Sequence, residues 1–413
     1  MDAYLKRFAD TVLLDRLRLS GAVLIQGAKG CGKTETALQA AKSSIRFDVD
    51  EEIAFRMEID PKSVLEGPVP RLIDEWQEYP QIWNYIRREV DDRKEKGQFI
   101  LTGSANPEER ARLHSGAGRF SIIKMRPMSL FERGWSTGEV SLSSLLKGQP
   151  PTSEPVQLNL EKLAERLTIG GWPSLLGANS RDALRFMQDY ATLIAEVDIN
   201  RVSGKKRDPQ KIMRLLQSLS RNISTEASLS TLSKDTGIST GETIAEYLDV
   251  LERLMVVEQL PAWSTHIRST DTLRKAPKRH FVDPSFAIGT LALTTEKLLA
   301  DLNYVRFLFE SLVIRDLRIY ADLHDGHIYH YRDSRNLEID AIVEYPDNTW
   351  AAFEVKMGFN AQDEAAANLL RFADKIDQNR MGKPAALTVI TANGFACRRK
   401  DGINVVPLQV LTA

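Results

Sequence analysis

Apolar positions in the first hundred residues predict short strands that alternate with helices. Strands are expected at residues 22–25, 46–49, 69–73 and 99–102, and helices at residues 4–17, 35–42 and 81–96. In the helices apolar residues recur every three or four positions, whereas the strands are short continuous apolar runs. Strands that alternate with helices are typical of a parallel sheet covered on both faces. The fold class expected for this part is therefore α/β.

The rest of the chain divides into two further parts. Residues 139–157 are rich in Ser, Gly and Pro and mark the first boundary. From residue 161 to residue 263 the pattern is mostly helical, and strands return afterwards. They are expected at residues 327–332, 338–344, 350–356, 385–391 and 404–406, with helices at residues 304–320 and 363–376. The predicted domains are residues 1–145, 146–265 and 266–413, the last a second α/β unit.

Composition indicates where the protein works rather than how it folds. The 413 residues carry 55 basic and 56 acidic side chains, so any nucleic-acid contact has to come from a local patch. Two cysteines exclude a disulfide framework and favour a reducing compartment. Charges interrupt any apolar leader in the first residues, and no apolar run is long enough to cross a bilayer. We expect a cytoplasmic protein without a membrane partner.

A phosphate-binding pattern follows the first expected strand directly. Its glycines let backbone N–H groups turn inward around phosphates, Lys33 can reach the β- and γ-phosphates, and Thr34 can offer its hydroxyl to Mg²⁺. The residues predicted to bind ATP, with GTP left open, are Gly27, Ala28, Lys29, Gly30, Cys31, Gly32, Lys33 and Thr34. Cys31 lies beside two lysines at a helix N-terminus, which favours the thiolate. It is expected either to be a thiol that nucleotide protects from alkylation or to be a loop position without consequence.

Polar residues at the ends of two later strands extend this pattern. Asp74 would hold Mg²⁺ through water, and Glu75 would orient or deprotonate the attacking water; alone, such a pair would only favour a helix N-terminus. Thr102 and Ser104 are candidates to sense the γ-phosphate, the alternative being a simple turn. Arg119 could neutralise transition-state charge in its own subunit or a neighbour, or be a surface arginine. The chain between the loop and these acids leaves room for one intervening strand.

Acidic and basic side chains also gather near the C-terminus. If the two strands that carry them pair, Asp340, Glu354 and Lys356 can meet at one point, and Glu310 on the preceding helix can reach it. On the first strand, the face opposite Asp340 is expected to hold Ile339, Ala341 and Val343. Gathered carboxylates repel, and Mg²⁺ or Mn²⁺ held by Asp340 and Glu354 would offset this, with Lys356 assisting catalysis. The alternative is a solvated strand face with cross-strand ion pairs.

These residues carry a resemblance to known families. The Asp…Glu-x-Lys pattern resembles the PD-(D/E)XK nuclease superfamily. The whole chain resembles bacterial and archaeal proteins that join an N-terminal AAA-type ATPase to a C-terminal domain related to those nucleases. The matching segments are the phosphate loop and residues 72–77, 100–104, 118–119, 170–173, 280–284, 309–312, 331–333, 338–340, 354–356 and 401–403. The resemblance implies ATP binding, an AAA-like sheet in residues 1–145 and a restriction-endonuclease-like domain in residues 266–413.

The middle segment contains a further recognisable pattern. Residues 229–239 predict a helix and a tight turn into a second helix, and a strand candidate follows at residues 255–257, as in a winged helix. The second helix carries four acids against one base, so packing against protein is favoured over contact with phosphates. These residues are Glu242, Glu246, Asp249, Glu252 and Arg253.

Three functions remain open at this point. The first is a Mg²⁺-dependent ATPase that acts on nucleic acid through a nuclease-like domain. The second is an ATP-switched module whose nuclease-like fold binds DNA, RNA or protein without cutting. The third is an ATP-switched protein-interaction component that ignores nucleic acid. The number of subunits is left open.

Overall fold

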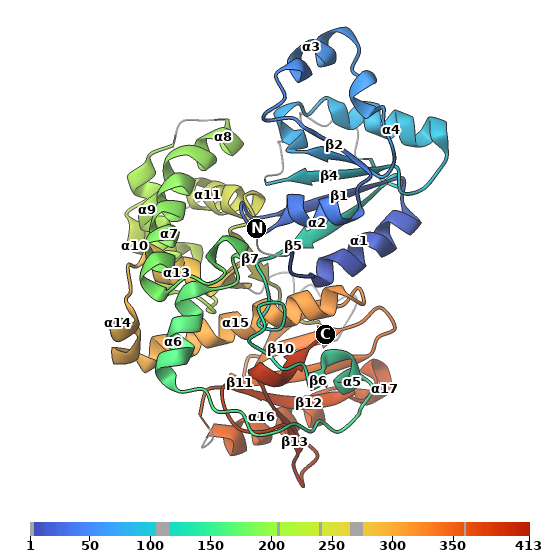
Figure 1. Ribbon diagram of the computed structural model, residues 1–413. Coiled ribbons are helices and arrows are strands. Elements are labelled where there is room, and N and C mark those ends of the chain that lie inside the picture. Colours follow the sequence, from blue (N-terminus) through green and yellow to red (C-terminus); the bar gives the residue numbers. More distant parts are fainter. Residues whose placement is uncertain (1–3, 105–115, 205–206, 239–241, 265–275, 359–360) are drawn as a thin grey trace.

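The computed structural model describes residues 4–104, 116–204, 207–238, 242–264, 276–358 and 361–413. Figure 1 shows a sheet-containing part near each end of the chain, with a group of helices beside the two sheets. Most of these helices come from the middle of the chain.

The N-terminal part is a five-stranded parallel sheet in the order β2-β3-β4-β1-β5, which confirms the prediction of a parallel sheet. Its strands are β1 (Ala22–Gly27), β2 (Ser43–Arg46), β3 (Arg71–Asp74), β4 (Phe99–Gly103) and β5 (Phe120–Met125). Its helices are α1 (Phe8–Leu19), α2 (Lys33–Ala40), α3 (Glu52–Ile59) and α4 (Ile82–Arg93). Side chains of α1 and α2 pack with Val23 and Ile25, whereas those of α3 and α4 pack with Ala22 and Leu24. Burial on both faces explains the continuous apolar run of β1.

The edges of this sheet differ from the sequence prediction. The strand expected at residues 46–49 lies at Ser43–Arg46, where Ser44 pairs with Leu72 of β3. Its two serines carry no apolar signal, because an edge strand needs less apolar surface than a central one. The opposite edge, β5, was not predicted and is only partly buried. In space, β4 is the strand that separates β1 from β3.

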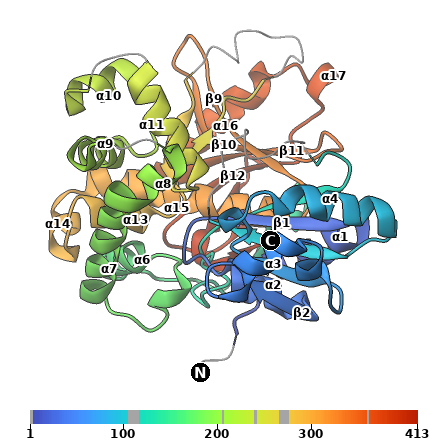
Figure 2. The same cartoon turned by 90° about the horizontal axis from the view of Figure 1, so that it is seen from above.

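The middle part is mostly helical, as its pattern predicted. Its helices are α6 (Leu160–Ile169), α7 (Ser180–Leu193), α8 (Ile199–Ser203), α9 (Pro209–Arg221), α10 (Leu229–Thr236), α11 (Glu242–Arg253), α13 (Pro284–Thr290) and α14 (Thr295–Ala300). A π-helical turn (Ile194–Asp198) joins α7 to α8, and β7 (Val257–Leu260) pairs antiparallel with β8 (Lys278–Phe281). In both views, α7, α9 and α10 lie to one side of the two larger sheets (Figures 1 and 2). Residues 239–241, where the predicted turn ends, lie outside the described residues.

The segment between the first and second parts packs against the C-terminal part. β6 (Val140–Ser141) pairs in parallel with β15 (Leu411–Thr412), and α5 (Leu142–Leu146) follows it. Val156 then forms a bridge with Gly394. The chain therefore leaves the first sheet, contacts the C-terminal residues and only afterwards enters α6. The domain boundaries given above stay a prediction.

The C-terminal part is a six-stranded mixed sheet in the order β13-β14-β12-β11-β10-β9. Its strands are β9 (His327–Arg332), β10 (Glu338–Glu344), β11 (Trp350–Lys356), β12 (Ala386–Thr391), β13 (Cys397–Arg398) and β14 (Asn404–Pro407). Its helices are α15 (Leu302–Asp322), α16 (Gln362–Lys375) and α17 (Gln378–Met381). β9, β10 and β11 are antiparallel neighbours, whereas β12 and β14 run parallel to β11. Buried side chains of α15 and α16 pack on opposite faces of this sheet.

The prediction that side chains along β10 alternate strictly between the two faces of the sheet is wrong. Ile339 and Ile342 both pack on the α16 side, whereas Ala341 and Val343 pack on the α15 side. The register between β9 and β10 shifts between Ile339 and Ile342, so an irregularity resets which face each residue occupies. Counting alternate residues along the sequence cannot reveal such a shift.

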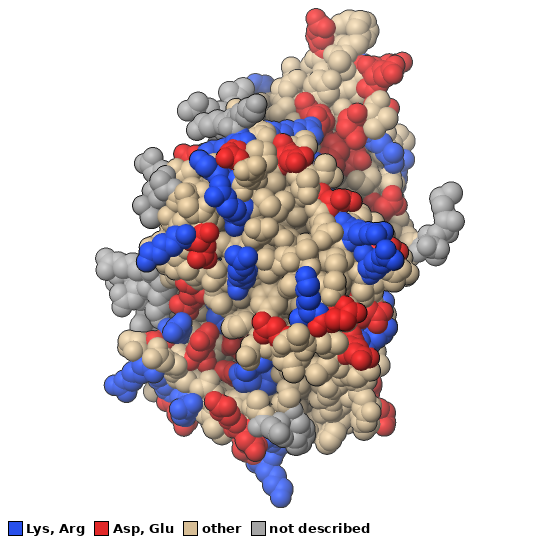
Figure 3. All heavy atoms as spheres, turned by 90° about the vertical axis from the view of Figure 1, so that its left-hand side faces the viewer, with Lys and Arg blue, Asp and Glu red and all other residues tan. Residues whose placement is uncertain are grey.

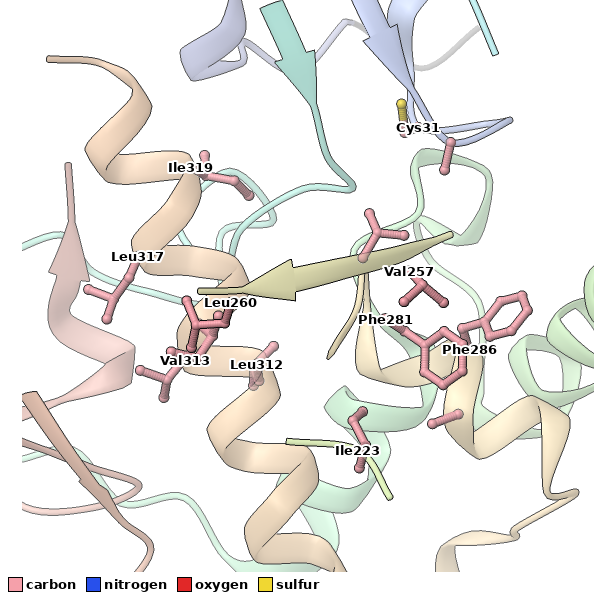
Figure 4. Close-up of a cluster of buried hydrophobic side chains, with 14 of the residues drawn as sticks. Cys31, Ile223, Val257, Leu260, Phe281, Phe286, Leu312, Val313, Leu317 and Ile319 are labelled. Carbon is pink, nitrogen blue, oxygen red and sulfur yellow. The ribbon is translucent and has the colours of Figure 1, made fainter. Parts of the chain in front are cut away.

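One buried apolar cluster joins the three parts of the molecule. Figure 4 shows Leu260 of β7 beside α15, and Val257 of the same strand beside Phe281 and Phe286. The rings of Phe281 and Phe286 have centroids 4.8 Å apart. β7 and β8 are therefore held between the helical middle and the C-terminal part, which fixes the polar residues of both strands in place.

Candidate nucleotide site and carboxylate centre

A glycine-rich loop joins β1 to α2 at the carboxyl edge of the N-terminal sheet. Gly32 has φ 101° immediately before α2, a backbone conformation that residues with a Cβ rarely adopt. A Cβ on Gly27 would lie 2.2 Å from the carbonyl oxygen of Met125 on β5, so a larger residue does not fit. These glycines are required for the tight path of the loop, which ends at the helix N-terminus where anions are favoured.

Lys33 folds back onto this loop. Its Nζ donates hydrogen bonds to the carbonyl oxygens of Gly27 and Ala28, both at 3.0 Å, and the residue is buried. Phosphate oxygens are stronger partners for an ammonium ion than neutral carbonyls are. Lys33 is also the first residue of α2, so its ammonium ion belongs to the residue that begins the helix.

Three polar residues from three elements meet beside Lys33. The hydroxyl of Thr34 donates to Asp74 Oδ1 at 2.8 Å, and the hydroxyl of Thr102 donates to the same oxygen. Asp74 ends β3 and Thr102 lies on β4, so the parallel order of the sheet brings them to one edge. Hydroxyl and carboxylate oxygens are the ligands that Mg²⁺ prefers, so this cluster fits the ion.

Glu75 lies next in the chain, with an unusual backbone. Its φ of 52° and ψ of 46° are left-handed, which is uncommon for glutamate and is found at functional sites. Gln77 donates a hydrogen bond to Glu75 Oε2, and the Ser104 hydroxyl lies 3.5 Å from the same oxygen. Ser104 therefore contacts the second acid, whereas Thr102 contacts the first. Gln77 was not singled out as a site residue, because only its contacts with Glu75 and Ser104 in the folded chain connect it to the site.

Residues of the helical middle contact the loop from another side. Lys29 Nζ donates to Asp198 of the π-helical turn, and the Tyr190 hydroxyl of α7 donates to the Lys29 carbonyl at 3.1 Å. The Asp198 side chain is buried, while that of Lys29 is partly exposed. Asp198 follows Lys29 by 169 residues and lies in no recognisable motif, so sequence reasoning missed it.

Arg119 lies away from the loop of its own chain. Its carbonyl accepts a hydrogen bond from Ala22 N at the start of β1, whereas the loop follows the end of β1. The six residues of β1 span about 20 Å. The guanidinium Nε of Arg119 instead lies 2.9 Å from Asp91 of α4. This geometry argues against a catalytic role of Arg119 at a nucleotide bound by the same chain. A catalytic role at the nucleotide of a neighbouring subunit stays a prediction.

Cys31 differs from the reactive thiol that the sequence suggested. Its side chain is fully buried, and Sγ donates to the Met125 carbonyl at 3.6 Å. A reagent cannot reach a sulfur in this position without opening the loop. Packing of the loop against β5 explains Cys31 better than reactivity does.

Asp340, Glu354 and Lys356 meet on the C-terminal sheet. Asp340 Oδ2 accepts a hydrogen bond of 2.8 Å from the backbone N–H of Val355, because β10 and β11 pair antiparallel. Lys356 Nζ lies 2.7 Å from Glu354 Oε2 and 3.9 Å from Asp340 Oδ2. Asn368 of α16, which sequence reasoning missed, donates to Glu354 Oε1 at 2.7 Å. Their predicted catalytic roles stay predictions.

A second lysine, also missed, enters this group from β8. Lys278 Nζ lies 2.7 Å from Glu338 Oε1, 2.9 Å from Glu310 Oε1 and 3.7 Å from Asp340 Oδ1. Only 4% of the Lys278 side chain is exposed. We call the whole group the carboxylate centre: Glu310, Glu338, Asp340, Glu354, Lys278 and Lys356.

Burial and pairing shift the protonation equilibria of this centre. Burial raises the pKa of Glu310 and of Glu354, and Asp340 adds to both rises, although the lysines oppose them. Burial by itself lowers the pKa of Lys278, but the carboxylates around it raise that pKa above the ordinary value. The pKa of Lys356 is raised in the same way. Both lysines are therefore ammonium ions at neutral pH.

The carboxylate centre as arranged does not fit a divalent cation. Each oxygen of Asp340 already faces an ammonium ion, and Oδ2 also accepts a backbone hydrogen bond. Across the described residues, no group of three or more His, Cys, Asp or Glu side chains is placed to hold a metal ion. The positive charge in this centre comes from lysine side chains.

Three segments of the chain match families of known domains. Residues 20–133 match the AAA domain. This match supports an AAA-type ATPase. Residues 160–297 match a domain of unknown function (DUF8612), and residues 306–411 match another (DUF4143). The loop, Asp74, Glu75 and Thr102 all lie within the AAA segment, which supports nucleotide binding there.

Two mycobacterial proteins are similar to most of this chain. The uncharacterized proteins Rv2008c of Mycobacterium tuberculosis and Mb2031c of Mycobacterium bovis are each 24% identical over 358 residues, covering 85% of this chain and 74% of theirs. Among solved structures, the Walker-type ATPase PABY2304 of Pyrococcus abyssi is similar over 70% of this chain and 96% of its own, with 11% identity and a TM-score of 0.42. The S. cerevisiae Hsp104–ADP complex is similar over 81% of this chain and 49% of its own, with 14% identity and a TM-score of 0.26. Within the described ranges, no helix combines the length and apolar character needed to cross a bilayer.

Proposed function

We propose that the N-terminal part binds ATP with Mg²⁺ and hydrolyses it. The shared hydrogen bonds of Thr34 and Thr102 to Asp74, beside Lys33, carry this proposal. In it, Lys33 exchanges its loop carbonyls for the β- and γ-phosphates, and Thr34 and Asp74 are the residues that would hold the ion. Mg²⁺, when bound, neutralises phosphate charge. The helix N-terminus and loop amides complete the phosphate site.

Glu75 is the proposed base that orients the attacking water. Gln77 and Ser104 contact its carboxylate and limit its rotation, so they are positioning residues. Thr102 is the proposed link to the γ-phosphate, because it shares Asp74 with the residue that would hold the ion. The Glu75→Gln variant is expected to bind ATP normally and to lose about 10²-fold or more of its turnover.

Lys33→Ala tests the proposal as a whole. Loss of the ammonium should remove heat of ATP binding with Mg²⁺ in calorimetry and abolish phosphate release. Lys62→Ala is the matched control, since Lys62 is an exposed lysine of the same part and pairs with Glu89 at 3.5 Å. Wild-type turnover in Lys33→Ala, or no ATP binding by well-folded wild type, would overturn the assignment.

For the C-terminal part we propose a nuclease-like fold that binds without cutting. The order helix α15, antiparallel β9–β10–β11, helix α16 and parallel β12 supports the fold. The proposal that this part does not cut rests on the two ammonium ions in the carboxylate centre. They already neutralise the acids that would have to bind a metal ion for cleavage. DNA or RNA is the proposed ligand, by resemblance to the nucleases.

The helical middle is proposed to contain a winged helix that packs against protein. Helices α9, α10 and α11 followed by β7 and β8 have the order that such a unit requires. On α11, Glu246 already pairs with Arg207 at 2.8 Å. Figure 3 shows acidic and basic side chains intermixed over the described atoms of the face to which the helical middle belongs, rather than one broad basic surface. That face is a poor match for a phosphate backbone.

Fluorescence anisotropy with labelled single- and double-stranded DNA and RNA tests the proposed binding. Salt-dependent binding that changes with ATP in wild type but not in Lys33→Ala is the expected result. Cleavage of any of these probes with Mg²⁺ or Mn²⁺, lost in Asp340→Asn, would overturn binding without cutting. Absence of any binding at low salt would favour a protein ligand.

A further inference from the structure

Lys278 lies at the point where three carboxylates converge. Glu310 comes from α15, and Glu338 and Asp340 come from β10. An ammonium group has three N–H donors, and three carboxylate oxygens lie 2.7, 2.9 and 3.7 Å from this one. The side chain is nearly buried, so water does not replace the carboxylates as partner.

A divalent cation would need the same oxygens. Mg²⁺ and Ca²⁺ bind carboxylate oxygens at about 2.0–2.6 Å, so the oxygens that lie 2.7, 2.9 and 3.7 Å from Lys278 Nζ would have to move inward around a metal ion at that point. Two cations cannot share the position, because they would repel at contact distance in a poorly solvated site. The ammonium group therefore competes directly with a metal ion.

We propose that the Lys278 ammonium is the resident cation of the carboxylate centre and that it excludes a divalent cation as long as β8 keeps its place. The inference deepens the proposed binding without cutting and rests on it. It also accounts for the mismatch between four gathered acids and the lack of a metal-binding group among the described residues.

The cation and the acids belong to different segments of the chain. Lys278 lies within residues 160–297, which match one family, whereas the four acids lie within residues 306–411, which match another. Lys278 is held in place by β-pairing, since it lies opposite Leu260 of β7. Exclusion of the metal thus depends on how the two-stranded sheet sits on the C-terminal sheet.

Mn²⁺ is the probe, and the nucleotide-free full chain is the sample. Lys278→Met removes the charge while keeping most of the volume of the side chain. Free Mn²⁺ is measured by electron paramagnetic resonance. Wild type is expected to take up no Mn²⁺ that depends on Asp340. Lys278→Met is expected to bind one Mn²⁺ at the carboxylate centre with an affinity at least about tenfold higher than that of wild type, because a nearby like charge is gone. Its melting temperature should rise with Mn²⁺, and that of wild type should not.

Two controls make the result specific. Lys278→Met combined with Asp340→Asn should lose the gained site. Lys375→Met removes a lysine that pairs with Asp333 at the surface and should gain no Mn²⁺. If Lys278→Met does not fold, the added change Glu338→Gln lowers the charge of the centre while leaving two acids at the vacated position.

The outcomes separate this inference from the proposed function. Asp340-dependent Mn²⁺ binding by wild type overturns the inference, and so does a folded Lys278→Met that binds no Mn²⁺. Cleavage of nucleic acid by wild type overturns binding without cutting instead. Loss of ATP turnover in Lys33→Ala bears on neither.

Discussion

Removing the charge of Glu258 should destabilise the whole molecule, because this acid joins its three parts. Glu258 of β7 lies 3.0 Å from Arg126, which follows β5, and 2.7 Å from Arg318 of α15. The three side chains are 16%, 9% and 8% exposed, so solvent screens them little. In Glu258→Gln the two guanidinium groups lose their shared carboxylate. Breaking a buried pair in this way costs about 3–5 kcal/mol.

The lowered pKa of Glu258 gives a second, independent value for the loss of stability. Burial by itself would raise the pKa of Glu258, but Arg126 and Arg318 lower it from 4.5 to about 2. A depression of about 2.5 pKa units at about 1.4 kcal/mol each is worth roughly 3 kcal/mol. Because the folded pKa is depressed, this stabilisation is complete above pH 4.5 and is lost as the pH falls toward 2. At pH 3.5 about 2 kcal/mol should remain.

Urea titrations followed by tryptophan fluorescence measure the free energy of unfolding for wild type and Glu258→Gln. The difference should be about 3 kcal/mol at pH 7 and should shrink by about 1 kcal/mol at pH 3.5. Asp325→Asn is the control: its carboxylate pairs with Arg16, but 56% of the side chain is exposed, so a change of at most about 1 kcal/mol is expected. A difference that is below about 1 kcal/mol, or that is the same at both pH values, would refute this reasoning.

Three further predictions concern the nucleotide site. Asp198→Asn should raise ATP affinity in calorimetry by about 3- to 10-fold, because a carboxylate that competes for Lys29 is lost; unchanged or weaker binding would contradict this. Ellman's reagent should modify Cys397 in the native protein and Cys31 only after denaturation, because Cys31 is buried and Cys397 is partly exposed; equal native rates for both thiols would count against the packing described. Gly32→Ala should cost about 1–3 kcal/mol in urea titrations and weaken ATP binding, because a Cβ disfavours φ 101°; an unchanged free energy of unfolding would show that the loop adopts another conformation.

Residues that are close in sequence were predictable, and residues brought together by distant segments were not. The phosphate loop could be placed because eight consecutive residues carry its whole pattern behind an apolar strand. The position of Asp74 and Glu75 near the loop could also be predicted, because parallel strands end at one edge of a sheet. Lys278 and Asp198 carry no local pattern, since each acquires its partner only through packing of the middle part. Ile339 was misplaced because the shift in β10 leaves no mark in the apolar spacing.

The two-stranded sheet of β7 and β8 connects the charge networks of the molecule. Glu258 on β7 pairs with Arg126, which follows β5 of the N-terminal sheet, and on the paired strand Lys278 contacts the carboxylate centre. Glu258 lies opposite His280, two residues from Lys278, so the two contacts are less than about 10 Å apart along β8. The two-stranded sheet thus carries, on neighbouring strands, the acid that contacts the N-terminal part and the lysine that contacts the carboxylate centre.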